Sequence, residues 1–163
     1  MTNLSIGLIG AGAVGCFYAG QLARCGAAVT IITRTPEDYG SDICVDSPDG
    51  DFSFTPIHVC SFSESVGPFD VLILATKVLP TIDSVALTQP FMSPTTLLMV
   101  IQNGLFIEDP LLAAYDQPIL RCLAFICVAR ASKTHIQHMD FGSLSIGLLN
   151  GDMAQLTGHP LLD

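Results

Sequence analysis

Hydrophobic residues fall into short runs separated by glycine, proline and polar residues, a pattern typical of an α/β fold. The continuous apolar runs over residues 4–9, 70–75 and 96–101 predict strands buried on both faces, as in a parallel sheet. Residues 28–33 predict another strand, and the amphipathic stretch 14–25 predicts a helix between it and the first strand. The chain therefore opens with a βαβ unit.

Shorter elements are predicted in the middle of the chain. Residues 43–45 and 52–54 flank a Ser-Pro-Asp-Gly turn and predict a hairpin, and residues 57–60 predict another short strand. Residues 81–87 predict a short helix. Asp109 is followed by a proline, which predicts Asp109 as the N-cap of a further helix.

The pattern changes after residue 118. Residues 119–129, 135–139 and 143–149 predict consecutive antiparallel strands, with Gly142 as a turn between the last two. The predicted fold is therefore α/β: a Rossmann-like, mostly parallel sheet with additional antiparallel strands near the C-terminal end.

Composition indicates an apolar globular chain. Half of the 163 residues are hydrophobic, 13% are charged, and the mean hydropathy is +0.55. We expect one domain over residues 1–150, followed by residues 151–163 as a tail or the start of another domain. No apolar run reaches the roughly 18 residues of a membrane span, and no basic region precedes the first apolar run, so neither a span nor a signal peptide is expected.

Charge and cysteine content limit the possible partners. The net charge is −9, from 6 basic and 15 acidic residues, which argues against a nucleic-acid partner. The six cysteines form no C-x-x-C pair and favour a cytoplasmic chain with reduced, mostly buried thiols. His135 and His138 are expected on opposite faces of a strand, so no metal site is predicted.

A glycine-rich segment between the first strand and the first helix indicates dinucleotide binding. Gly10 permits a sharp turn, Gly12 permits close approach of a pyrophosphate, and Gly15 permits tight helix–strand packing. The alternative is a tight βα turn in another α/β fold. The predicted cofactor-binding residues of this segment are Gly10, Ala11, Gly12, Ala13, Val14 and Gly15.

Polar side chains after three strands extend this prediction. NAD sites place an acid at the end of the second strand, whereas here Arg34 follows that strand and favours the 2′-phosphate of NADP. Lys77 and Asn103 follow two further strands, where parallel sheets bind ligands, and are predicted phosphate, ribose or substrate contacts. The alternatives are a solvated arginine, a solvated lysine and an ordinary Asn-Gly turn.

Together these segments resemble the N-terminal NADP-binding domain of the ketopantoate reductase (2-dehydropantoate 2-reductase) family. The resemblance is carried by residues 9–15, 29–34, 74–77, 102–104 and 142–147 and covers nearly all of the chain. It implies an oxidoreductase that uses NADPH to reduce a 2-oxo acid to a 2-hydroxy acid on the route to pantothenate.

The resemblance also implies roles for individual residues. Gly10, Gly12 and Gly15 would bind the pyrophosphate. Arg34 and Lys77 would meet the 2′-phosphate, and Asn103 would lie near the ribose or the substrate.

The chain departs from the family in two ways. Residues 105–107 read Leu-Phe-Ile, where the family has another glycine and polar residues. The family's catalytic lysine and substrate-binding glutamate belong to a second, helical domain, so no catalytic residue is predicted here and the chain alone is expected to be inactive. An apolar face would then be covered by that domain or by self-association. The alternatives are a non-catalytic NADP(H)-binding or regulatory module that pairs with another chain, and an enzyme for a different 2-oxo acid.

Overall fold

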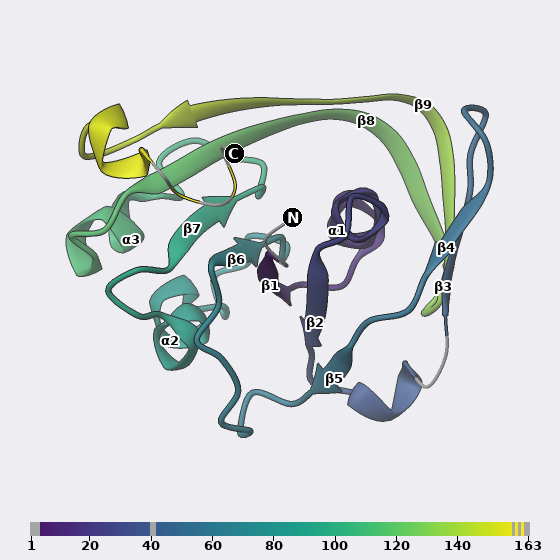
Figure 1. Ribbon diagram of the computed structural model, residues 1–163, viewed down its shortest axis with the longest axis horizontal. Coiled ribbons are helices and arrows are strands. Elements are labelled where there is room, and N and C mark those ends of the chain that lie inside the picture. The colour runs from purple at the N-terminus through teal and green to yellow at the C-terminus, as the bar shows by residue number, and fades with distance from the viewer. Residues whose placement is uncertain (1–3, 40–41, 158, 160, 162–163) are drawn as a thin grey trace.

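The computed structural model describes residues 4–39, 42–157, 159 and 161, which fold around one sheet (Figure 1). The spatial order of its nine strands is β4-β3-β9-β8-β7-β6-β1-β2-β5. The elements are β1 (Ser5–Ile9), α1 (Ala13–Arg24), β2 (Ala28–Ile32), η1 (Pro36–Asp38), β3 (Ile43–Asp46), β4 (Phe52–Phe54), β5 (His58–Cys60), β6 (Val71–Leu74), α2 (Ser84–Thr88), η2 (Gln89–Phe91), β7 (Leu97–Val100), α3 (Asp109–Ala114), β8 (Ile119–Ser132), β9 (His135–Leu148) and η3 (Met153–Leu156).

The centre of the sheet is parallel and buried on both faces. Strands β5, β2, β1, β6, β7 and β8 pair in parallel. In β6, Val71 and Ile73 pack on the side of α1, whereas Leu72 and Leu74 pack on the opposite side. Because successive side chains of a strand point to opposite faces, both sets are apolar and the run is uninterrupted.

The long β8–β9 hairpin wraps around α1. Strand β8 pairs with β7 only through Ile119–Arg121 and then continues as an antiparallel pair with β9. Figure 1 shows this ribbon arching over α1 and meeting β3, which pairs in parallel with β9. Helix α1 is thereby enclosed between the central strands and the hairpin, and the predicted Rossmann-like α/β fold is confirmed.

Most predicted elements lie within one or two residues of their expected positions. This holds for the βαβ unit β1–α1–β2, for the β3–β4 hairpin, and for strands β5, β6 and β7. Apolar periodicity and turn residues were sufficient there, because local sequence and burial favour the same structure.

The prediction of two strands in residues 135–149 was wrong: residues 135–148 form one strand, β9, and Gly142 is not a turn. Phe125 pairs with Ser143 but Ile126 pairs with Phe141, so Gly142 is an extra residue on β9. Gly142 has φ +132° and Phe141 has φ +62°. These conformations make a β-bulge, which keeps the strand continuous while increasing its bend.

Two helix starts differ from the prediction. Asp109 is the first residue of α3 rather than its N-cap; that position is Glu108, whose side chain makes no capping hydrogen bond. Helix α2 begins at Ser84, later than expected, because the Asp83 carboxylate accepts hydrogen bonds from the N–H groups of Val85 and Ala86. Asp83 thus satisfies two N–H groups of the first turn, which fixes the start of the helix at Ser84.

All six cysteines are free, but only half of them are buried, so the expectation of mostly buried thiols was wrong. Cys16, Cys60 and Cys122 are buried and Cys25, Cys44 and Cys127 are exposed. Burial raises the pKa of the Cys16 and Cys122 thiols to about 12. Cys44 and Cys127 are exposed because they occupy outward-facing positions of their strands.

The turn between β1 and α1 brings backbone against backbone. Gly10 has φ +98°, and a Cβ there would lie 2.5 Å from the Thr76 nitrogen. A Cβ on Gly15 would lie 2.5 Å from the Gly10 carbonyl oxygen. Gly12 differs: its φ is −83°, and a Cβ there would meet nothing within 4 Å.

We expect Gly10→Ala to destabilise the fold strongly, by about 2–4 kcal/mol, because the side chain adds both an unfavourable φ and a clash. Gly12→Ala, the matched control, should cost less than about 1 kcal/mol, the difference between glycine and alanine at an N-cap. Urea unfolding of the two variants provides the measurement. Equal losses of stability would contradict the packing described for this turn.

A carboxylate joins the start of β6 to β1. The Asp70 Oδ2 atom accepts hydrogen bonds from the Ser5 amide at 2.8 Å and the Ser5 hydroxyl at 2.7 Å. These donors favour the charged form and hold the pKa of the Asp70 carboxyl below its ordinary value.

Because the folded-state pKa of Asp70 is lowered, its stabilisation is present above the unfolded pKa, about 3.9, and is lost as the pH falls through the folded-state pKa. Asp70→Asn should therefore lower the free energy of unfolding by about 1 kcal/mol at pH 7, with the difference from wild type shrinking towards pH 3. Denaturant titrations across pH measure this. Asp116→Asn, which changes an exposed carboxylate, is the control; a pH-independent difference for Asp70→Asn would refute the assignment.

Candidate functional site

The first turn of α1 presents free backbone donors at the carboxyl end of the sheet. Gly12 is the N-cap residue; no side chain caps this end, and the first turn contains no acidic residue. The N–H groups of Ala13, Val14 and Gly15 therefore lack intrahelical partners and form the positive end of the helix dipole. Together with the open space at Gly12, this geometry fits a phosphate group.

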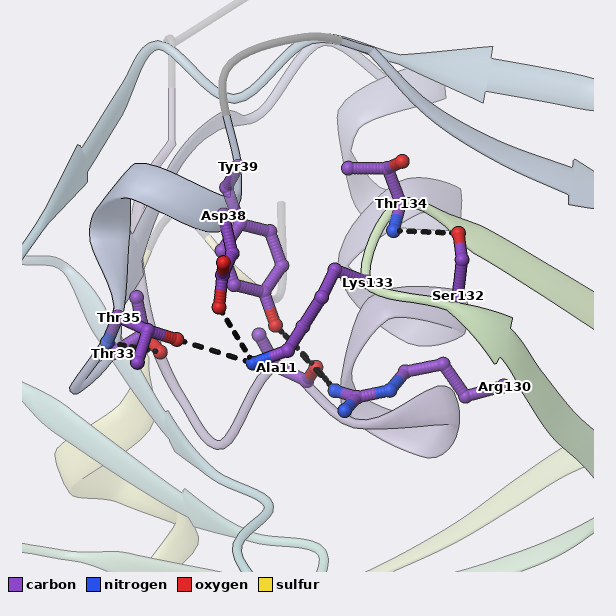
Figure 2. Close-up of polar contacts among 9 residues, drawn as sticks. All are labelled: Ala11, Thr33, Thr35, Asp38, Tyr39, Arg130, Ser132, Lys133 and Thr134. Atoms are coloured by element: carbon purple, nitrogen blue, oxygen red, sulfur yellow. Dashed lines mark hydrogen bonds and ion pairs between the residues drawn. The ribbon is translucent and has the colours of Figure 1, made fainter.

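The carbonyl group of Ala11, in the glycine turn, is engaged by two side chains. Its oxygen accepts a hydrogen bond from the Tyr39 hydroxyl at 3.0 Å and from Arg130 Nη1 at 2.9 Å (Figure 2). A free carbonyl oxygen at this turn would repel a phosphate. The two donors reduce that repulsion because they bind the Ala11 oxygen.

The carboxyl end of β2 carries Arg34, as predicted. Arg34 is exposed, and in the part of the chain that the structure describes it makes no hydrogen bond or ion pair. Its neighbour Thr35 accepts a hydrogen bond from Lys133 Nζ at 3.1 Å, and Lys133 also pairs with Asp38 at 2.9 Å. This cluster lies beside the glycine turn (Figure 2).

The carboxyl ends of β6 and β7 carry Lys77 and Asn103. Both side chains are exposed. The Gln102 Nε2 atom donates to the Thr76 hydroxyl at 2.7 Å and so ties the two loops together. Strands β2, β1, β6 and β7 are parallel neighbours, so the fold places Gly10–Gly15, Arg34, Lys77 and Asn103 along one edge of the sheet.

Three cations at this edge escaped the sequence interpretation, although the chain has only six. Arg121 donates to the carbonyl oxygens of Gln102 at 2.6 Å and Gly104 at 2.8 Å, and so fixes the loop that carries Asn103. Arg130 and Lys133 reach the glycine turn and the end of β2. Because basic residues are scarce in this acidic chain, each of them was a candidate for a functional role. Their positions could not be predicted from the local sequence, because they depend on the path of β8 and β9 around α1.

A separate apolar cavity of about 450 Å³ lies on the α1 side of the sheet. Its wall is mostly aliphatic and includes Leu22, Met99, Leu144, Ile146 and Leu156. Ile146 is 51% exposed. The glycine turn does not contribute to this cavity, which is therefore distinct from the predicted phosphate site.

The described residues show neither a metal site nor a membrane-spanning helix. In that part of the chain, no group of three or more His, Cys, Asp and Glu side chains is arranged to hold a metal ion. No helix there is long and apolar enough to span a membrane.

Comparison with known proteins matches residues 6–151 to the family Ketopantoate reductase PanE/ApbA. A 2-dehydropantoate 2-reductase from Nostoc sp. is 26% identical over 90% of this chain and 47% of its own length. Among solved structures, the 2-dehydropantoate 2-reductase from Methylococcus capsulatus is 35% identical with a TM-score of 0.82, over 89% of this chain and 48% of that one. The enzyme from Geobacter metallireducens GS-15 is 27% identical with a TM-score of 0.84, over 94% and 52%.

The fold also occurs in a D-mandelate dehydrogenase solved in a ternary structure with NADH and anilino(oxo)acetate. That protein is 21% identical, with a TM-score of 0.75 over 97% of this chain and 52% of that one. The chain spans about half the length of the relatives it matches. Because the family match covers residues 6–151 and the fold agrees, the chain belongs to the ketopantoate reductase family and corresponds to its N-terminal, Rossmann-like domain.

Proposed function

We propose that this chain is the NADPH-binding domain of an oxidoreductase that reduces a small 2-oxo acid, such as 2-dehydropantoate, to a 2-hydroxy acid. The observation that carries the proposal is the uncapped start of α1, with open space at Gly12 and Arg34 on the adjoining strand end. When bound, the coenzyme supplies a hydride for the substrate carbonyl carbon. The residues of this chain hold and orient that coenzyme.

Individual residues receive roles from their positions. The N–H groups of Ala13, Val14 and Gly15 bind the pyrophosphate. Arg34 and Lys77 contact the 2′-phosphate, and Asn103 donates an amide hydrogen bond to the ribose or the substrate. The Arg121 contacts hold the Asn103 loop in place.

The choice of NADPH rests on the end of β2. The strand is followed by Thr33 and Arg34, so no acid stands where NAD-binding domains hold the ribose hydroxyls. The D-mandelate dehydrogenase was solved with NADH, so the shared fold alone does not select the coenzyme. The guanidinium of Arg34, which makes no hydrogen bond or ion pair with the described residues, supports NADP.

Catalysis requires groups beyond those that bind coenzyme. A positioned acid must protonate the alkoxide that forms on hydride transfer. By the family resemblance, that acid belongs to a helical domain, which residues 151–163 would begin after a dinucleotide-binding domain of residues 1–150. We propose that the 163-residue chain alone binds NADPH without measurable turnover.

The apolar cavity supports a second proposal about partners. An aliphatic surface of this kind next to exposed Ile146 is costly in water. We propose that a helical domain of a longer enzyme covers it, and the alternative is a separate chain or self-association, as for a regulatory module. The six free cysteines further support a reducing, cytoplasmic location, which imaging of a tagged chain would check.

We expect NADPH to bind with a dissociation constant on the order of 10 μM, within the range of about 1 μM to 1 mM that enzyme KM values span. Arg34→Ala should weaken NADPH binding about tenfold or more while leaving NADH binding unchanged, because it removes a charge-assisted phosphate contact. Fluorescence titration with both coenzymes measures this. Arg24→Ala is the matched control, since Arg24 lies in the last turn of α1 and contacts Gln21 and Phe52.

An unchanged NADPH preference in Arg34→Ala would remove this residue from the site. Failure of the wild-type chain to bind either coenzyme at millimolar concentration would overturn the proposed function itself.

The cavity proposal predicts that the isolated chain self-associates or binds a hydrophobic dye, because about 450 Å³ of apolar space is otherwise left to water. Ile146→Ser should reduce either effect without altering NADPH affinity, since the residue lines the cavity and not the glycine turn. Light scattering and dye fluorescence are the measurements. A wild-type chain that stays monomeric and binds no dye would contradict the proposal.

A further inference from the structure

The turn between β8 and β9 delivers two cations to the region predicted to hold the adenosine end of the coenzyme. Arg130 lies near the end of β8, and Lys133 lies in the turn that follows that strand. Figure 2 shows both side chains reaching back towards the glycine turn and the end of β2. Each contact joins segments about a hundred residues apart in sequence, so neither follows from local pattern.

The two cations do different things. Arg130 is exposed, and its Nη1 atom donates to the Ala11 carbonyl at 2.9 Å and to the Tyr39 hydroxyl at 3.5 Å. These contacts hold the Ala11 carbonyl of the glycine turn.

Lys133 is held over the end of β2 but remains accessible. Its Nζ atom donates to the Thr35 hydroxyl at 3.1 Å, pairs with Asp38 at 2.9 Å and lies 5.9 Å from the centre of the Tyr39 ring. Its side chain is 43% exposed. An ammonium group has three donors, and Thr35 and Asp38 engage two of them, so a phosphate can bind the remaining donor and compete with Asp38 for the positive charge.

The charge of this region makes that remaining donor important. Thr35 directly follows Arg34, the residue proposed to meet the 2′-phosphate. Asp38 stands beside it, and in a chain of net charge −9 it would repel a phosphate that carries up to two negative charges. Hydrogen bonding by Lys133 lowers the pKa of the Asp38 carboxyl, so the two groups form a charge-neutral pair next to Arg34.

We propose that Lys133 is a second determinant of coenzyme choice: its ammonium group contacts the 2′-phosphate of NADPH together with Arg34, and Asp38 is its counter-ion when no phosphate is bound. This inference rests on the proposed function. The preference for NADPH over NADH would then depend on both the end of β2 and the β8–β9 turn. Asp38 competes with the phosphate for Lys133 and so limits the affinity for NADPH.

The test compares ligands that differ only in the 2′-phosphate: NADPH with NADH, and 2′,5′-ADP with 5′-AMP. Lys133→Met should weaken NADPH and 2′,5′-ADP about tenfold and change NADH and 5′-AMP less than about twofold. Lys133→Arg should restore most of the preference because it keeps the charge. Asp38→Asn should strengthen binding of the phosphorylated pair a few-fold, because it frees Lys133. Calorimetry gives the affinities, and thermal melts report whether each variant is folded.

Each outcome decides the proposal. Loss of affinity for the phosphorylated ligands alone, with recovery in Lys133→Arg, supports it. If Lys133→Met weakens both ligand classes equally, or lowers the melting temperature without changing either affinity, Lys133 only stabilises η1 and the proposal is overturned. The role of Arg34 and the proposed function are unaffected by that result. Weaker NADH binding in Asp38→Asn would show that Asp38 binds the ribose diol, which also overturns it. If Lys133→Met does not fold, the other two variants decide. A wild-type chain that binds none of the four ligands overturns this inference and the proposed function together.

Discussion

The close contact between the β1–α1 turn and the end of β6 is the constraint on which the candidate site depends. The start of α1 packs closely against the sheet because Gly10 and Gly15 have no side chains. A Cβ at either position would lie 2.5 Å from a backbone atom. This contact places the uncapped N-terminus of α1 at the carboxyl edge of the parallel strands. Arg34, Lys77 and Asn103 follow strands that end at the same edge, so the geometry of one turn makes their positions relevant to a single ligand.

The β8–β9 hairpin supplies half of the basic residues of this Rossmann-like domain. In an acidic chain, three of the six basic residues come from this one hairpin: Arg121 and Arg130 on β8 and Lys133 in the turn. Their contacts go to the loop after β7, the glycine turn and the end of β2 respectively. The bend of β9 at Gly142 keeps the hairpin continuous as it passes over α1. The path of β8 and β9 around α1 thus also brings positive charge to the edge of the sheet that carries the glycine turn.

Some elements of the fold could be predicted from the sequence and others could not, and the difference has physical reasons. Strands β6 and β7 are buried on both faces, and such strands need uninterrupted apolar runs. The span of β9 was missed because a positive-φ glycine fits a turn and a bulge equally well, and only pairing with β8 separates them. The start of α3 was missed because Asp109 and Pro110 suit the first turn as well as the cap. Cys44 and Cys127 proved exposed because which face of a strand is buried depends on what packs against it.

Residue order alone was enough to place the glycine turn between a strand and a helix, and to place Arg34, Lys77 and Asn103 just after strands. These features depend on neighbours in sequence: glycine conformations, apolar runs and strand ends. Three-dimensional pairing was needed to show that Tyr39 and Arg130 hold the Ala11 carbonyl and that Lys133 lies over Thr35 and Asp38. Those contacts join distant segments, so they depend on the path of β8 and β9 across the sheet, which local chemistry does not specify.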